Sequence, residues 1–235
     1  MTPSIRPRSG QSLVFDADDT LWQNNVLFER VVEDYLDWLA HPTLDRGEIR
    51  SILDDVEAAN ARSSGYGARA FLANLAETFQ RLHARPVKPE EQQEIEQLAA
   101  ALLRHDIELM PGVADVLEQL GSRHDLYLLT KGDRTEQERK IAASGLMHHF
   151  LAVRIVPEKD AAVYRALAAE HRLDPGRTWM IGNSPKSDIL PARAAGLYAV
   201  HIPHDQTWVL EQAELDPADS GVLTLPNFPA LLEHF

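Results

Sequence analysis

The chain has 235 residues, 44% of them hydrophobic and 25% charged, which is enough for one large domain or a domain with a sizeable insertion. Its formal net charge of −13, without a stripe of Lys and Arg, argues against nucleic acid or an anionic membrane as a partner. The absence of cysteine excludes disulfides, thiolate catalysis and cysteine-bound zinc.

Residues 1–12 include two arginines but lack the apolar segment of a signal peptide. No run of about 18 apolar residues occurs elsewhere, so the sequence offers no candidate membrane span. We therefore expect a cytoplasmic protein.

The first part of the chain predicts one strand followed by a group of helices. A short apolar run at Leu13–Phe15 is typical of a buried strand. The interval 23–110 then shows helical apolar spacing in four stretches, separated by Pro- and Gly-containing breakers. A single crossover helix is enough to join two parallel strands, so roughly eighty residues of this pattern indicate an inserted helical bundle. The stretches are Phe28 to Leu39, Ile49 to Val56, Phe71 to Leu82 and Ile95 to Leu102.

After Pro111-Gly112, apolar runs alternate with helical stretches such as 134–144, which Gly145 closes, and 161–170. This alternation is typical of a parallel sheet covered by helices on both faces. We predict an α/β protein with a doubly wound, Rossmann-like core at 1–22 and 108–235 and a helical domain at 23–107. The later strands are expected at Leu126–Leu129, Leu151–Val156, Trp179–Ile181, Tyr198–Ile202 and Val222–Leu225.

Polar residues that directly follow the apolar runs form the candidate site, because open parallel sheets bind ligands at the carboxyl ends of their strands. Asp16, Asp18, Asp19 and Thr20 follow the first run, and the crowding of three acids requires a counter-charge. Together with the later residues they suit a divalent cation and an anionic substrate. The later residues are Thr130, Lys131, Gly132 and Asp133; Glu158, Lys159 and Asp160; and Asn183 to Asp188.

Taken singly, these residues also have structural interpretations. The acids and the threonine after the first strand are common helix N-caps, Lys159 could be a solvated surface lysine, and Asp188 could face solvent at a helix start. A calcium loop is excluded, because Leu21 and Leu27 stand where it requires Gly and Glu. The joint placement of the polar residues favours one shared site.

Four motifs in order resemble those of the haloacid dehalogenase-like (HAD) hydrolases. Asp16-Ala17-Asp18-Asp19-Thr20-Leu21 resembles the first motif, DxDxT, and Thr130 looks like the second. Lys159 looks like the third-motif lysine, and Gly182-Asn183-Ser184 through Asp188 is similar to the fourth, acidic motif. The helical insertion stands where family members carry a C1 cap, so the resemblance covers the whole chain.

The resemblance implies roles for these residues. Asp16 would be the nucleophile that forms an aspartyl-phosphate, and Asp18 would protonate the leaving oxygen and later accept a proton from water. Thr130 and Lys159 would bind the phosphoryl oxygens, with Lys131 and Gly132 beside Thr130 as further substrate-binding residues.

The same resemblance implies a Mg²⁺ site. Its ligands would be the carboxylates of Asp16 and Asp188, the backbone carbonyl of Asp18 and, directly or through water, Asn183. Many relatives have an acid in place of Asn183. We therefore expect weaker metal affinity in this chain, with activity retained.

Asp18 favours a phosphatase over a 2-haloacid dehalogenase, because a leaving alkoxide needs a proton and a halide does not. The expected activity is Mg²⁺-dependent hydrolysis of a small phosphorylated metabolite, with a phosphomutase left open. A receiver-type signalling domain is disfavoured by the chain length and the insertion. A non-enzymatic phosphate-binding relative is disfavoured by the intact Asp16 and Asp18. The sequence leaves open a monomer or a homodimer.

The insertion is expected to set specificity by closing over the site. Its most informative segment is the stretch Ala61–Gly67, expected as a flexible loop, in which Arg62 and Tyr66 either contact the leaving group or form an ordinary turn. The pairs His148-His149 and His201 with His204 are expected to be surface histidines, because no acids accompany them. No role is assigned to residues 204–208.

Overall fold

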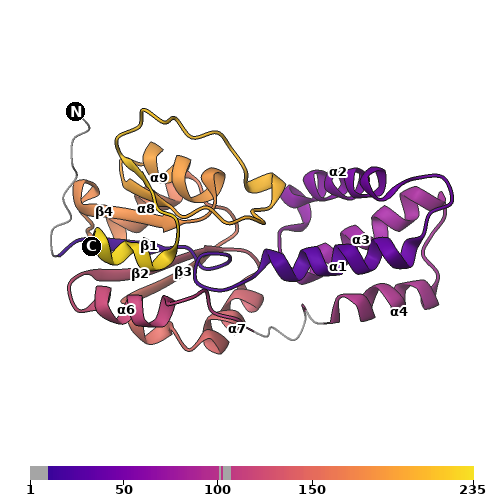
Figure 1. Cartoon of the computed structure of the whole chain (residues 1–235), viewed down its shortest axis with the longest axis horizontal. Coiled ribbons are helices and arrows are strands. Elements are labelled where there is room, and N and C mark those ends of the chain that lie inside the picture. Colours follow the sequence, from indigo (N-terminus) through magenta and orange to yellow (C-terminus); the bar gives the residue numbers. More distant parts are fainter. Residues whose placement is uncertain (1–9, 101, 103–106) are drawn as a thin grey trace. The chain divides into compact units, whose positions relative to one another are not determined.

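The computed structural model describes residues 10–100, 102 and 107–235. It comprises two compact units: a core unit, Met1–Asn25 with Ile107–Phe235, and a helical unit, Val26–Asp106. Figure 1 shows the sheet and its helices in the first and a group of helices in the second.

The core unit contains a six-stranded parallel sheet in the order β3-β2-β1-β4-β5-β6. Each apolar run expected to be a strand is one, and the predicted α/β fold class is confirmed. The strands are β1 Ser12–Phe15, β2 Asp125–Lys131, β3 Ala152–Val156, β4 Thr178–Gly182, β5 Tyr198–His201 and β6 Val222–Thr224.

Helices cover both faces of this sheet because its strands are apolar on both. Leu13 and Phe15 of β1 pack in a cluster with residues of α6 (Val113–Gly121) and η5 (Phe228–Glu233), whereas Val14 between them packs in a cluster with residues of α8 (Ala161–His171) and α9 (Leu190–Ala194). This alternation follows from the two-residue period of a strand. The elements between the strands are α6 Val113–Gly121, α7 Arg134–Ser144, α8 Ala161–His171, α9 Leu190–Ala194, η1 Met147–His149, η2 Pro175–Arg177, η3 Pro185–Ile189, η4 Val209–Glu211 and η5 Phe228–Glu233.

Two strands extend beyond the carboxyl ends of their apolar runs, which corrects the expected boundaries. Thr130 and Lys131 belong to β2 rather than following it, because they stay in register with Ile155 and Val156 of β3. Gly182 likewise is the last residue of β4. Backbone pairing, which does not depend on hydropathy, sets where a strand ends.

The helical unit contains α1 Asn25–Leu39, apart from its first residue, with α2 Arg46–Ser64, α3 Ala68–His83 and α4 Pro89–Leu98. A capping box formed by Asp45 and Glu48 starts α2. The apolar faces meet in a core where Phe28 and Phe71 pack edge to face, with ring centroids 5.1 Å apart. Among the residues that the structure describes, none of the helices has the length and apolar character to span a membrane.

Candidate active site

Asp16 directly follows β1, the strand between β2 and β4, and its backbone N–H donates to Ile181 of β4 at 2.9 Å. The side chain is buried. Its position at the carboxyl end of a central parallel strand is where this kind of sheet binds ligands.

Lys159 joins Asp16 to the fourth sequence motif. Its buried ammonium donates to Oδ1 of Asp16 and, at 2.8 Å, to Oδ1 of Asp188, which is fully buried. The interpretations of Lys159 as a surface lysine and of Asp188 as solvent-facing are therefore wrong. Burial alone lowers the pKa of Lys159, but the charges of the two aspartates raise it above its ordinary value.

Two carboxylates share this single ammonium. Burial, and then the charge of Asp188, raise the pKa of Asp16 to about 7 despite the opposing effect of Lys159. An additional cation would relieve the repulsion between the two acids. The counter-charge expected from the sequence is thus only partly supplied by the protein.

The residues around Asp188 supply further oxygen atoms that could bind a metal ion. The backbone N–H of Ser184 donates to Oδ2 of Asp188 at 3.0 Å. The hydroxyl of Thr20 lies 3.2 Å from Oδ2 of Asp16 and 3.3 Å from Oδ1 of Asn183, so Thr20 bridges the first and fourth motifs. Carboxylate and amide oxygens are the ligands that Mg²⁺ prefers, so these side chains fit a hard divalent cation.

Asp18 lies in a separate cluster of hydrogen-bond donors. Its Oδ1 accepts from the indole of Trp22 at 2.7 Å, and its Oδ2 accepts from the amide of Gln137 at 3.1 Å. The ammonium of Lys140 lies 3.2 Å from both oxygens. The Gln137 amide also donates to Oγ1 of Thr130 at 2.5 Å, which leaves the Thr130 hydroxyl proton free to donate elsewhere.

Lys131, at the end of β2, has a carboxylate partner that the sequence did not reveal. Its ammonium lies 2.5 Å from Oε1 of Glu211 in η4 and 2.9 Å from the Ser187 hydroxyl. Oε2 of Glu211 accepts from Ser184 at 2.6 Å, so the 209–211 turn is anchored on the fourth motif. Gly132 follows with φ of 138°, a backbone conformation that favours glycine.

Asp19, the third acid of the first motif, has the structural role of a helix cap, which is the alternative interpretation of these acids. It adopts φ of 59°, and its Oδ1 accepts from the backbone N–H groups of Asn24 and Asn25 at 2.9 Å. Asn25 is the first residue of α1, and Asn24 directly precedes it. Asp19 therefore caps the start of a helix.

The segment expected as a loop at Ala61–Gly67 is largely helical, which corrects that prediction. α2 continues to Ser64, and only residues 65–67 connect it to α3. Gly65 and Gly67, with φ of 73° and 103°, make the turn that a longer loop was expected to make. Tyr66 is half-buried within the turn, whereas the side chain of Arg62 lies outside the part of the structure that is described.

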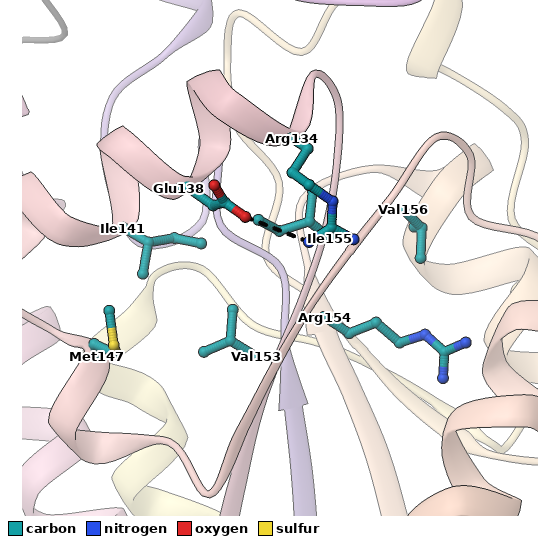
Figure 2. Close-up of a pocket in the computed structure, with 8 residues that line it drawn as sticks. All are labelled: Arg134, Glu138, Ile141, Met147, Val153, Arg154, Ile155 and Val156. Atoms are coloured by element: carbon teal, nitrogen blue, oxygen red, sulfur yellow. Dashed lines mark hydrogen bonds and ion pairs between the residues drawn. The ribbon is translucent and has the colours of Figure 1, made fainter.

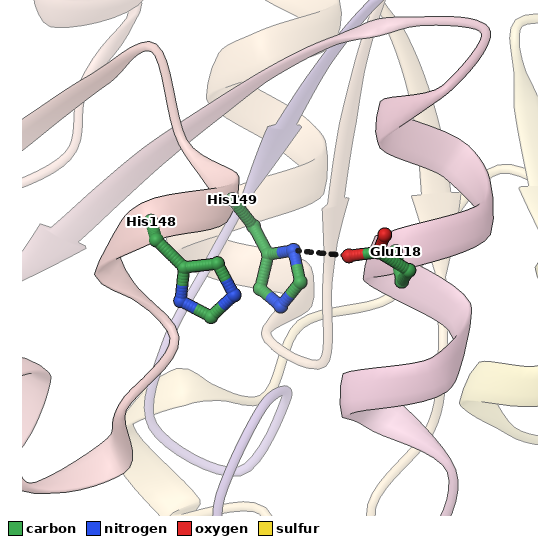
Figure 3. Close-up of side chains that lie close together, drawn as sticks. All are labelled: Glu118, His148 and His149. Atoms are coloured by element: carbon green, nitrogen blue, oxygen red, sulfur yellow. Dashed lines mark ion pairs between the residues drawn. The ribbon is translucent and has the colours of Figure 1, made fainter.

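The histidines differ from expectation, because the side chain of His149 is largely buried and because an acid accompanies one pair. His148 and His149 follow each other in η1, and Glu118 of α6 does accompany them, with its Oε2 3.7 Å from Nδ1 of His149 (Figure 3). One ligand atom from each of the three lies within 4.8 Å of the others. His148 and His149 shortly precede β3, whereas Asp16 follows β1, so in this parallel sheet the histidines lie toward the opposite end of the strands from Asp16. His201 contacts the Asn183 carbonyl, and His204 contacts Gln23.

A pocket of about 460 Å³ lies between α7 and β3 (Figure 2). Arg134, Glu138 and Ile141 of α7 form one wall, and Val153–Val156 of β3 form the other. None of the motif residues lines it. We therefore place the candidate site at the polar clusters around Asp16 and Asp18, not at this pocket.

Sequence reasoning missed Trp22, Gln137, Lys140 and Glu211 as members of the site. Gln137 and Lys140 lie three residues apart on α7 and so share one helix face. That spacing was the one available signal that both side chains point toward the site. Nothing in the residues next to Lys140 in the sequence shows that this lysine is buried.

Comparisons with known proteins identify a family. A family model described as haloacid dehalogenase-like hydrolase matches residues 11–196. A phosphoserine phosphatase of Thermus thermophilus is 33% identical over 82 residues, which cover 33% of this chain and 33% of that protein. The chain thus matches about a third of the length of that relative.

Solved structures match nearly the whole chain. A haloacid dehalogenase-like family hydrolase from Xanthomonas campestris is 29% identical with a TM-score of 0.81, covering 96% of each chain. A 2-haloacid dehalogenase from Pseudomonas syringae pv. Tomato is 19% identical with a TM-score of 0.61, covering 95% of this chain and 97% of that one. The second likeness concerns the fold alone.

Proposed function

Because the chain belongs to the haloacid dehalogenase-like hydrolase family, we propose that it hydrolyses small phosphomonoesters with Mg²⁺ through an aspartyl-phosphate on Asp16. The observation that carries this proposal is the second acid, Asp18. Its carboxylate lies among hydrogen-bond donors, one of which is the Gln137 amide that also contacts Thr130. A carboxylate in this position serves proton transfer to an alkoxide, which the departure of a halide does not require.

In the first step, a carboxylate oxygen of Asp16 attacks phosphorus, and the ester P–O bond breaks. Asp18 donates a proton to the leaving oxygen, which departs as an alcohol. Lys159 and Thr130 bind the phosphoryl oxygens with an ammonium and a hydroxyl.

In the second step, water attacks the aspartyl-phosphate while Asp18 accepts its proton. The P–O bond to Asp16 breaks, so that inorganic phosphate forms and the Asp16 carboxylate is restored. Asp18 is then protonated again and ready for the next leaving group.

The carboxylates of Asp16 and Asp188 and the backbone carbonyl of Asp18 would hold Mg²⁺, with Asn183 contributing directly or through water. Bound Mg²⁺ would reduce the charge on the phosphoryl group and so permit approach of an anionic nucleophile. Lys159, already paired with both carboxylates, contributes part of the same neutralisation.

The similarity to a phosphoserine phosphatase supports a phosphate ester as substrate, although it covers only a third of that protein. A phosphomutase would use the same two acids. It is separated from a phosphatase by mass balance, because a pure mutase releases no free phosphate.

The helical unit is proposed as a cap, with the core at 1–22 and 108–235 and the cap at 23–107. Cap segments supply walls that open sheets lack, so Arg62 and Tyr66 are proposed contacts of the leaving group. Arg62→Ala and Tyr66→Phe should change KM values across a panel of phosphate esters. Unchanged preference in both variants would show that neither side chain contacts the leaving group.

The central experiment is a screen of phosphorylated metabolites with Mg²⁺, in which released phosphate is measured. Asp16→Asn should abolish turnover and leave the circular dichroism spectrum and melting temperature near those of the parent protein. Chloride release from 2-chloropropionate in the same preparation tests the dehalogenase alternative. Undiminished phosphate release by folded Asp16→Asn, or chloride release alone, would overturn the proposal.

A further inference from the structure

Lys140 is a buried cation in α7, a helix that is otherwise rich in exposed polar residues. Only 9% of its side chain is exposed. Lysine is seldom buried unless its charge is paired. Burial lowers the pKa of Lys140, but the charges of Asp18 and Glu136 raise it above the ordinary value, so the ammonium stays charged.

The ammonium of Lys140 has a fixed direction. An ammonium has three hydrogens, and the Nζ of Lys140 has three acceptor groups around it. Both carboxylate oxygens of Asp18 lie 3.2 Å from Nζ, Oδ1 of Asn24 lies at 2.8 Å, and Oε1 of Glu136 lies at 3.2 Å. Asp18 and Asn24 belong to the loop that follows β1, whereas Glu136 is one turn away on α7. Lys140 therefore ties α7 to the loop that carries the second acid.

The Asp18 carboxylate is held from several sides. Besides Lys140, the Trp22 indole binds Oδ1 and the Gln137 amide binds Oδ2. Each carboxylate oxygen of Asp18 thus accepts from one neutral donor of its own, and both oxygens contact the Lys140 ammonium. A carboxylate bound in this way has little freedom to rotate, and this orientation matters for proton transfer to a leaving group.

We propose that Lys140 is a positioning residue, which orients the Asp18 carboxylate for protonation of the leaving oxygen. The inference rests on the proposed phosphatase function, in which Asp18 moves protons. Lys140 acts on the reaction through Asp18 alone, by geometry. A lysine that merely joined α7 to the loop would affect every substrate equally.

The test exploits this difference with two substrates. The first is 4-nitrophenyl phosphate, whose leaving phenolate needs no proton. The second is the best alkyl phosphate found in the phosphate-release screen, whose alkoxide does need one. For Lys140→Met we expect kcat/KM to fall roughly 10- to 100-fold for the alkyl ester and less than about threefold for the aryl ester.

Arg139→Met is the matched control, since Arg139 is an exposed cation on the same helix. It should leave both kcat/KM values unchanged. Melting temperatures of the two variants separate loss of function from unfolding, and Lys140→Arg tests whether a cation in different geometry rescues the alkyl ester in part.

A double-mutant cycle completes the test. In an Asp18→Asn background, Lys140→Met should cause no further selective loss on the alkyl ester, because the group it orients is gone. Equal losses on both substrates, or a selective loss that persists in Asp18→Asn, would overturn the inference. If Asp18→Asn itself shows no preference between the esters, the proposed proton transfer at Asp18 fails instead.

Discussion

Gly182 and Asp188 approach each other so closely that only glycine fits the first position. A Cβ added to Gly182 would lie 2.2 Å from Oδ2 and 2.5 Å from Cγ of the fully buried Asp188. Gly182 thus creates the space that the Asp188 carboxylate occupies beside Lys159.

We expect Gly182→Ala to displace Asp188 and to raise the Mg²⁺ concentration needed for half-maximal activity by roughly tenfold or more. A magnesium titration of the phosphate-release rate measures this. Gly121→Ala is the matched control, because its Cβ would lie 3.6 Å from Leu126, an ordinary contact. Equal metal dependence in the two variants would show that the carboxylate tolerates the shift.

Asn183→Asp should tighten metal binding. Asn183 is buried, with Oδ1 3.3 Å from the Thr20 hydroxyl, and a carboxylate there adds a negative charge to the proposed ligands. Affinity of such sites rises with the number of charged ligands, so the half-saturating Mg²⁺ concentration should fall roughly five- to tenfold. The reverse change, Asp188→Asn, should raise it. A half-saturating Mg²⁺ concentration that rises in Asn183→Asp would contradict the placement of Asn183 at the metal site.

Removal of Glu211 should destabilise the core unit. Glu211 pairs with Lys131 at 2.5 Å and accepts from Ser184 at 2.6 Å. Glu211→Ala should lower the free energy of unfolding by about 1–3 kcal/mol. The loss is limited to this range because Lys131 keeps its contacts with Glu158 and Ser187. Urea denaturation measures the change, and the exposed Glu214, replaced by Ala, should leave it within about 0.5 kcal/mol.

Asp219 should make stability depend on pH. Its two oxygens accept from the Arg193 guanidinium at 2.9 Å, which lowers the pKa of Asp219 below its ordinary 3.8. A carboxyl with a lowered pKa in the folded state stabilises the protein above its unfolded pKa, and this contribution is lost as the pH falls through the folded value.

Asp219→Asn should therefore reduce the free energy of unfolding by about 1–2 kcal/mol at pH 7, with the difference shrinking below about pH 4. Urea denaturation of both proteins across this range tests the sign. Asp205→Asn, at an exposed position, serves as the comparison. A difference that grows on acidification would contradict the assigned role of the Arg193 pair.

Much of the fold could be predicted from local patterns. Short apolar runs predicted each strand, because every residue of a strand buried on both faces must be apolar, as Leu13, Val14 and Phe15 illustrate. Strand ends were less predictable. The pairing of Lys131 with Val156 lengthens β2 through backbone hydrogen bonds, which side-chain hydropathy does not encode.

The sequence by itself determined which residues stand at the carboxyl ends of the strands, because chain order and strand polarity place Asp16, Lys159 and Asp188 at one edge of a parallel sheet. Only the tertiary structure decided the partners of those residues. Lys140 and Asp18 are 122 positions apart, yet their charges are 3.2 Å from each other. Burial of a charge and its pairing depend on the packing of α7 against the loop after β1, and no local pattern in either segment specifies that contact.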